Sequence, residues 1–209
     1  MCFSSASFFY NPFTNHLLWV KNNITMKKRG TLMNDIVLKR PSPKYIEAIE
    51  SYKQAFLNAK SSMDGTGSLR ESKTALDWIE GLKHMENPRT CPEDKVSSST
   101  YLAIRKTDHV LVGIIDLRHH INHPILSVWG GHIGYSVHPE ERRKGYAKGM
   151  LGEVLEIAKT RGLSKVLITC DEDNVASLRT IKSQGGVFES NVSTEQGLVN
   201  RFWINLKTA

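Results

Sequence analysis

Cysteine is scarce in this sequence of 209 residues, and its spacing does not suit metal binding or cross-linking. The three cysteines, Cys2, Cys91 and Cys170, form no CxxC pair and are odd in number. This argues against a disulfide framework and fits a reducing compartment. No stretch approaches about 18 consecutive apolar residues, and the positive charges near the N-terminus follow the apolar segment instead of preceding it, unlike a secretory signal. We therefore expect a cytoplasmic protein that has no membrane partner.

Acidic residues are absent from residues 1–33, which hold four of the basic side chains. The formal net charge is +7, and this distribution leaves +3 for residues 34–209. A modest positive excess suits a phosphate-bearing small molecule, whereas nucleic-acid-binding proteins usually carry a basic stripe or patch. Basic and aromatic residues are not interleaved in this sequence. We therefore expect no nucleic acid partner.

The first 33 residues show neither helical nor strand periodicity. Two explanations stay open. The codons for Lys28-Arg29-Gly30 can form a purine-rich tract that resembles a bacterial ribosome-binding site, so translation would begin at Met33 and residues 1–33 would be a non-native extension. Alternatively, they form a disordered N-terminal tail. In both cases residues 34–209 are expected to form one domain, because the chain is too short for two full ones.

From Asp35 onwards, strand-like and helix-like segments alternate. Short turns join three consecutive strands in the middle of the chain, which predicts antiparallel pairing. The strongest helical periodicity runs from Ala147 to Ala158. These patterns predict an α/β fold of the mixed α+β kind, with a mostly antiparallel sheet flanked by helices. The expected strands are 36–38, 101–106, 110–117, 131–137, 165–170, 187–192 and 198–206, and the expected helices are 45–57, 69–82, 147–158 and 175–184.

A dense positive charge lies between the strand that ends at Val137 and the helix that begins near Ala147. The segment Arg142-Arg143-Lys144-Gly145-Tyr146-Ala147 opens directly onto this helix. A helix start presents unpaired N–H groups and partial positive charge, and Gly145 permits close approach of a ligand. The alternative is a solvated basic helix start, which the helix dipole disfavours by about 0.3–1 kcal/mol per cation. The combination predicts a site for a diphosphate.

Two segments resemble the GNAT superfamily of acyl-CoA N-acyltransferases. His132 to Leu151 is similar to its motif A, in which Arg or Gln, two residues, Gly, one residue and then Gly or Ala are matched by Arg142, Gly145 and Ala147. Asp171 to Ser177 resembles the family segment in which an Asn opens a helix and contacts the pantetheine arm. A simple helix cap by Asn174 is compatible with that role.

The resemblance implies a single GNAT-like domain whose sheet splays between its fourth and fifth strands. It implies acetyl-CoA as co-substrate, no metal, and direct attack by an amine in a ternary complex. Backbone N–H groups of the fourth strand would bind the pantetheine and the thioester carbonyl. The residues implied in acetyl-CoA binding are Val137, His138, Arg142, Arg143, Lys144, Gly145, Tyr146, Ala147, Asn174 and Ser177.

The acid and the base of the reaction are less well marked. An amine with a pKa of about 10.4 must lose a proton before it attacks. We rank His132 first as the base and Asp116 second, although an ordinary hydrogen-bonded strand residue is the alternative for each. Many family members protonate the leaving thiolate with a Tyr seven residues after the helix-opening Asn, where this chain has Ile181. Either the CoA thiolate leaves without help from the enzyme, or another group protonates it, and Tyr135 and Tyr146 are the substitutes considered.

Several alternatives remain at this stage. His119-His120-x-x-His123 permits a metal site, but a loop is favoured because no Cys or carboxylate is close in sequence. The chain is expected to acetylate a primary amine of a small molecule or protein, and a homodimer is the only self-association considered. A non-catalytic acyl-CoA-binding module of the same fold is the second hypothesis. A phosphate- or nucleic-acid-binding protein is the third.

Overall fold

The computed structural model describes residues 35–206. These residues lie in one compact unit. The interpretations of residues 1–33 fall outside the described residues and stay predictions. Among the described helices, none combines the length and apolar content needed to cross a membrane.

The first sheet is antiparallel and contains the four strands nearest the N-terminus, in the order β1-β2-β3-β4. Tyr101 and Tyr135 lie on either side of Ile115 in the register of β2, β3 and β4. Short turns and alternating side chains thus produced the pairing that was expected. The strands are β1 (Ile36–Lys39), β2 (Ser98–Arg105), β3 (Leu111–Arg118) and β4 (Ile133–Val137).

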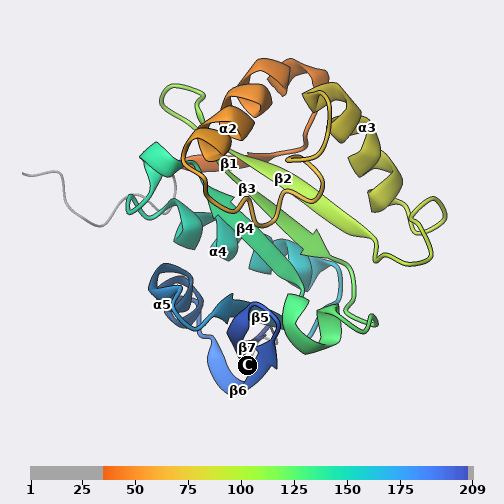
Figure 1. The fold of residues 1–209 in the computed structure, drawn as a ribbon, viewed down its shortest axis with the longest axis vertical. Helices are drawn as coiled ribbons and strands as arrows, with labels where there is room; N and C mark the ends of the chain where they lie inside the picture. Colours follow the sequence, from red (N-terminus) through yellow and green to blue (C-terminus); the bar gives the residue numbers. More distant parts are fainter. Residues whose placement is uncertain (1–34, 207–209) are drawn as a thin grey trace, which may run out of the picture. The chain divides into compact units, whose positions relative to one another are not determined.

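Helices cover both faces of this sheet, as Figure 1 shows. One face carries the turn η2 (Pro43–Tyr45) and the helices α2 (Ile46–Asn58) and α3 (Ala75–Glu86), and its core includes Tyr52 and Trp78. The other face packs against α4 (Tyr146–Thr160), which buries Met150 and Val154. Each helix has an apolar stripe at the expected spacing, which is why the two cores form on opposite sides of the sheet.

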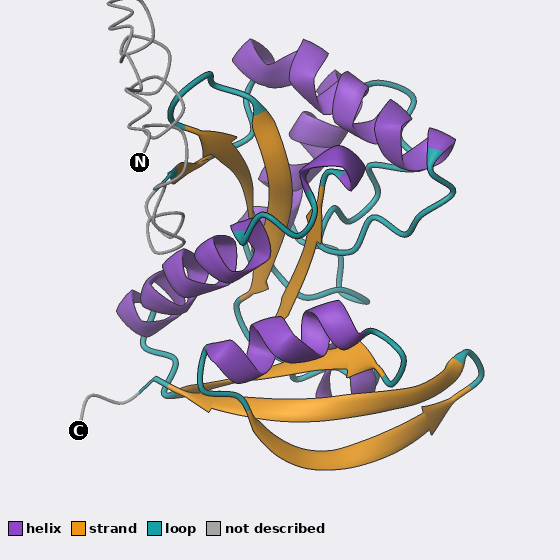
Figure 2. Cartoon of the chain, turned by 90° about the vertical axis from the view of Figure 1, so that its left-hand side faces the viewer, coloured by secondary structure: helices purple, strands orange, loops and turns teal. Residues whose placement is uncertain are grey.

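The second sheet has the strand order β5-β7-β6 and is also antiparallel. It is formed by β5 (Lys165–Asp171), β6 (Val187–Thr194) and β7 (Gly197–Asn205), with α5 (Val175–Ser183) between β5 and β6 in the chain. Figure 2 shows its strands spreading away from those of the first sheet. The expected separation between the fourth and fifth strands is therefore confirmed.

The two sheets meet at one end of the gap between β4 and β5. The His132 N–H donates to the Leu167 carbonyl oxygen at 2.7 Å, and the Leu167 N–H donates to Nδ1 of the His132 side chain at 2.9 Å. Beyond this pair the strands diverge toward the N-termini of α4 and α5. An open cleft results on the carboxyl side of both strands.

Three local expectations were wrong. The second helix begins at Ala75, not near Leu69, because Thr74 and Asp77 form a capping box. The second strand begins at Ser98 and not at the expected Tyr101, because its serines are buried against neighbouring side chains. The connection before β4 contains a π-helical turn, η3 (Leu126–Gly130), which the sequence pattern did not indicate.

Candidate functional site

A cleft of about 1060 Å³ occupies the gap between β4 and β5. Its walls come from both sheets, from the first turns of α4 and α5, and from the loop that follows α2. Eight of the ten residues expected to bind acetyl-CoA line it, whereas His138 and Lys144 do not. The eight are Val137, Arg142, Arg143, Gly145, Tyr146, Ala147, Asn174 and Ser177.

The turn before α4 is shaped to present backbone N–H groups. It passes through η4 (Pro139–Glu141) and ends at Gly145, the N-cap, which has φ 90°. Arg143 is also left-handed, with φ 62°. The Gly149 N–H donates to the Gly145 carbonyl oxygen at 3.2 Å, so the N–H groups of the first helical turn have no partner within the helix. Such a cradle suits a pyrophosphate, and the residues present therefore fit this part of CoA.

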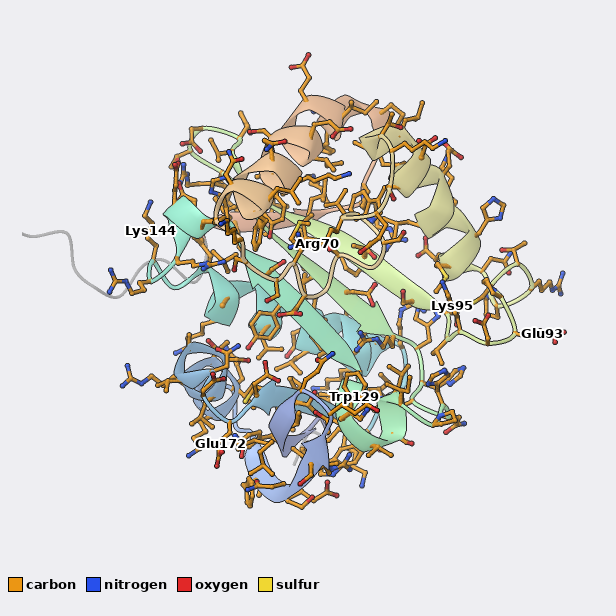
Figure 3. The ribbon with its side chains drawn as sticks, in the orientation of Figure 1. Arg70, Glu93, Lys95, Trp129, Lys144 and Glu172 are labelled. Atoms are coloured by element: carbon orange, nitrogen blue, oxygen red, sulfur yellow. The ribbon has the colours of Figure 1, made fainter. Side chains whose placement is uncertain are left out.

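The three basic side chains of this turn have different environments. The Arg142 guanidinium donates to Ser61 Oγ at 2.8 Å and to the Val137 carbonyl oxygen at 3.3 Å. Lys144 forms an ion pair with Glu141 at 2.9 Å, and it lies at the outer edge of the molecule in Figure 3. Arg143 lines the cleft and has no ion pair among the described residues. The sequence argument treated these cations alike, because their partners lie elsewhere in the chain.

The N-terminus of α5 forms the facing wall. Asn174 Oδ1 accepts the Ser177 N–H at 3.0 Å, so the helix-cap interpretation is confirmed. Asn174 also lines the cleft, which leaves its amide N–H₂ group able to reach a ligand. The contact of Asn174 with a pantetheine arm stays a prediction.

Tyr135 extends from β4 to this wall. Its hydroxyl lies 2.8 Å from Ser177 Oγ. Burial raises the pKa of Tyr135 to about 12, and the hydrogen bond to Ser177 opposes that shift. The phenol is therefore protonated across the neutral range.

The two candidate bases lie beside the cleft and are not part of its wall. His132 is 5% exposed and accepts the Leu167 N–H with Nδ1; burial lowers the pKa of its imidazole to about 4. Asp116 is buried and accepts the Thr100 hydroxyl at 2.8 Å; burial raises the pKa of its carboxyl, and the positive charge of Arg118 acts in the opposite direction. Both side chains have the hydrogen-bonded strand role that was the alternative for each.

The backbone donors of β4 follow the antiparallel alternation. The His138 N–H donates to the Val112 carbonyl oxygen at 2.9 Å, so it is not available to a ligand as was expected. Residues that alternate with His138, namely Tyr135 and Val137, direct their N–H groups away from β3 and toward the gap. The donor pair on this strand is therefore Tyr135 and Val137.

The loop after α2 forms a wall that sequence reasoning missed. Gly65 lies against β4 so closely that an added Cβ would be 2.1 Å from the Gly134 carbonyl oxygen, and its φ is 75°. Asp64 lines the cleft beside it. These residues lie between the expected helices 45–57 and 69–82, so the sequence pattern assigned them no element. Nothing in the local sequence indicates that this segment crosses β4.

The η3 turn forms the end wall, and Trp129 lines the cleft there (Figure 3). Three side chains hold this turn through its carbonyl oxygens: Arg118 at Gly130, Arg201 at Ser127, and Thr169 at Trp129. Two other tryptophans do not line the cleft: Trp78 is 1% exposed in the core, and the Trp203 indole N–H donates to Glu189.

Two further sequence features lie outside this chemistry. Ile181 is fully buried in the core and does not line the cleft. The three histidines between β3 and η3 contact different groups. Nδ1 of His119 faces Ser97 Oγ, His120 accepts the Asn122 N–H, and Nε2 of His123 lies 3.1 Å from the Asp94 carbonyl oxygen. Among residues 35–206 no cluster of three His, Cys, Asp or Glu side chains could hold a metal ion.

Comparisons with known proteins agree with this geometry. The family model described as acetyltransferase (GNAT) domain matches residues 36–187. No curated protein matches the chain. Among solved structures, RimJ from Mycobacterium smegmatis in complex with a CoA disulfide has 16% identity and a TM-score of 0.62, with 81% of each chain covered. RimL, a ribosomal alpha-N-protein acetyltransferase in complex with coenzyme A, has 13% identity and a TM-score of 0.61, covering 82% of this chain and 94% of that one.

A dodecameric spermidine N-acetyltransferase from Vibrio cholerae has 17% identity and a TM-score of 0.58, covering 82% of this chain and 94% of that one. At such identities these structures support the fold alone. The family model, by contrast, spans most of the sequence. The chain therefore belongs to the acetyltransferase (GNAT) family, and its class is that of an N-acetyltransferase.

Proposed function

We propose that this protein transfers an acetyl group from acetyl-CoA to a primary amine by direct attack in a ternary complex. The observation that carries the proposal is the cleft between β4 and β5, which opens at the unpaired N–H groups of α4. Bound acetyl-CoA supplies an activated thioester. The first turn of α4 and Arg143 hold the pyrophosphate, while Asn174 contacts the pantetheine arm.

The β4 backbone orients the reacting carbonyl. The N–H groups of Tyr135 and Val137 face the gap and can donate to the carbonyl oxygen as it gains negative charge. A single donor of this kind contributes roughly 2.7–4 kcal/mol to transition-state stabilisation.

The carboxylates of the cleft favour a cationic acceptor. Asp64 and Asp171 both line it, from the loop after α2 and from the end of β5. Partial burial raises the pKa of Asp171, and the negative charges of Asp64 and Asp173 raise it further. We propose that this pair attracts an ammonium group and accepts its proton. The assignment of His132 or Asp116 as the base stays a prediction from the sequence.

An acceptor panel tests this function. Purified protein is incubated with acetyl-CoA and with polyamines, amino acids, aminoglycosides or peptides with free N-termini, and thiol release is measured against a no-acceptor background. We expect release with at least one class. If no class gives release while calorimetry detects CoA binding, the non-catalytic CoA-binding module replaces the proposal. Binding of phosphate that CoA does not displace would favour a phosphate-binding protein.

A further inference from the structure

We infer that Tyr135 donates a hydrogen bond to the sulfur of the departing CoA thiolate and that Ser177 positions its hydroxyl for this contact. This inference rests on the proposed function. It assigns a residue to the leaving thiolate, for which the family resemblance supplies none in this chain. The position where many relatives place a tyrosine is Ile181, which is fully buried in the core and cannot act as an acid.

The first argument is the position of the phenol. Tyr135 belongs to β4, whose backbone we propose to bind the thioester, and its side chain reaches Ser177 on the first turn of α5. The hydroxyl pair therefore connects the two walls between which the pantetheine arm would lie. A hydrogen-bond donor at this place can reach the sulfur from the side of β4, where it stabilises the negative charge that develops there.

The second argument is that the other hydroxyls of the cleft wall are committed elsewhere. Thr180 donates to the Ala176 carbonyl oxygen at 2.9 Å, and Thr169 donates to the Trp129 carbonyl oxygen at 2.6 Å. Ser62 donates to Asp64 at 3.2 Å.

The remaining three hydroxyls of the wall accept hydrogen bonds from other side chains. Ser61 Oγ accepts from Arg142 at 2.8 Å, and Ser136 Oγ accepts from Tyr52 at 3.1 Å on the face of β4 that packs against α2. The Tyr146 hydroxyl accepts from Arg105 at 3.1 Å, and its residue is 4% exposed. Tyr135 is the phenol of the wall whose hydroxyl pairs with a hydroxyl of the facing wall, that of Ser177.

The step balances without any further reagent. The amine nitrogen bonds to the acyl carbon, the carbon–sulfur bond breaks, and its electron pair stays on sulfur. The Tyr135 hydroxyl donates a hydrogen bond to that sulfur as negative charge develops on it, and the thiolate takes a proton from solvent after it leaves. The proton lost by the amine passes to a base on the cleft wall and then to solvent.

A kinetic experiment tests the assignment with an acceptor found in the panel. We expect Tyr135→Phe to lower kcat roughly 100-fold with little change in KM for acetyl-CoA, and Ser177→Ala to lower kcat less. Tyr101→Phe is the matched control, because Tyr101 lies in β2 outside the cleft wall. Cys170→Ala tests the wall thiol. An unchanged kcat for Tyr135→Phe, or a larger loss for Cys170→Ala, would overturn the inference.

A binding experiment separates this inference from the proposed function, since it needs no turnover. A free thiol ionises with a pKa of about 8.5, whereas burial keeps the pKa of Tyr135 at about 12. We expect the affinity for CoA, relative to desulfo-CoA, to increase roughly tenfold or more between pH 7 and pH 10 in the wild type. The increase should vanish in Tyr135→Phe and persist in Tyr101→Phe. Equal increases in all three proteins would exclude a Tyr135 contact with sulfur, even if no acceptor is turned over.

Discussion

The His132 side chain accepts the Leu167 N–H at 2.9 Å, so an imidazole on one sheet completes the hydrogen bonding of a strand on the other. The same two residues are joined through the His132 N–H at 2.7 Å. This pair marks the point from which β4 and β5 diverge, and it therefore determines where the cleft begins. A His at this position aligns the two walls of the site without itself lining the cleft.

We predict that His132 makes the stability of the protein depend on pH in the acid range. Burial lowers the pKa of His132 to about 4, below its unfolded value of about 6.5. The unfolded chain then binds more protons between these values, so stability falls as the pH drops from 6.5 toward 4. The loss should reach about 2–3 kcal/mol. Urea unfolding at pH 7 and pH 4.5 measures it.

The substitution His132→Asn is the control for this effect, because an Asn oxygen can accept the Leu167 N–H but does not titrate. We expect its stability to vary less with pH than that of the wild type. His132→Ala should lose roughly 1–3 kcal/mol at pH 7, because the Leu167 N–H is left without a partner. If His132→Asn keeps the full pH dependence, another group is responsible, and His119, whose pKa burial lowers to about 4, would be examined next.

A second prediction concerns the loop that crosses β4. Gly65→Ala should lower the free energy of unfolding by more than 2 kcal/mol, by rough estimate, because the new Cβ would overlap the Gly134 carbonyl oxygen. Gly67→Ala is the matched control, since Gly67 also has a positive φ, 55°, but has no atom within 4 Å of the added Cβ. It should cost only about 1–2 kcal/mol. Equal losses in urea unfolding would show that the loop does not lie against β4.

The third prediction compares the effect on KM of removing Arg143, which lines the cleft, with that of removing Lys159, which lies outside it. Arg143→Asn should raise KM for acetyl-CoA roughly tenfold, because a charge-assisted hydrogen bond to phosphate is lost. Asn is chosen because it tolerates the positive φ of Arg143. Lys159→Asn removes the same charge from the last turn of α4 and should leave KM unchanged. Similar KM increases in both variants would indicate a general effect of net charge.

Local sequence patterns predicted the parts of this site that depend on chain neighbours. The spacing of Arg142, Gly145 and Ala147 indicated an anion site at a helix start, and the structure has φ 90° at Gly145 and a helix from Tyr146. Asn174 was recognised as a helix cap in the same way. Both features lie within a few residues of the element they control, which is why they can be read from sequence.

Contacts between distant segments were not predictable in this way. The strands β2 and β3 lie between Gly65 and Gly134 in the chain. No residue pattern in either segment indicates that the two glycines approach each other closely. His132 was ranked as a base for the intrinsic pKa of histidine, but its lone pair is engaged by Leu167. The fold class, by contrast, followed from periodicity and turn spacing, and the largest differences were the bounds of α3, the start of β2 and the η3 turn.

The fourth prediction concerns the two carboxylates of the cleft. Asp64→Asn and Asp171→Asn should each raise KM for a cationic acceptor roughly 3- to 10-fold and leave KM for acetyl-CoA unchanged, because an attraction between opposite charges is removed only for the acceptor. Glu172→Gln is the control, since Glu172 follows Asp171 in the chain but does not line the cleft. An equal KM increase in Glu172→Gln would indicate a long-range charge effect.

The pH dependence of Asp64→Asn tests the same pair more sharply. Partial burial raises the pKa of Asp171, and the negative charge of Asp64 raises it further. Asp171 accepts a proton only when ionised, so the acid limb of kcat/KM should lie above the ordinary range of a carboxyl. Removing the charge of Asp64 lowers the pKa of Asp171 and should move this limb to lower pH. A limb that stays in place in Asp64→Asn, but disappears in Asp171→Asn, would keep Asp171 as the base and exclude Asp64 as its neighbour.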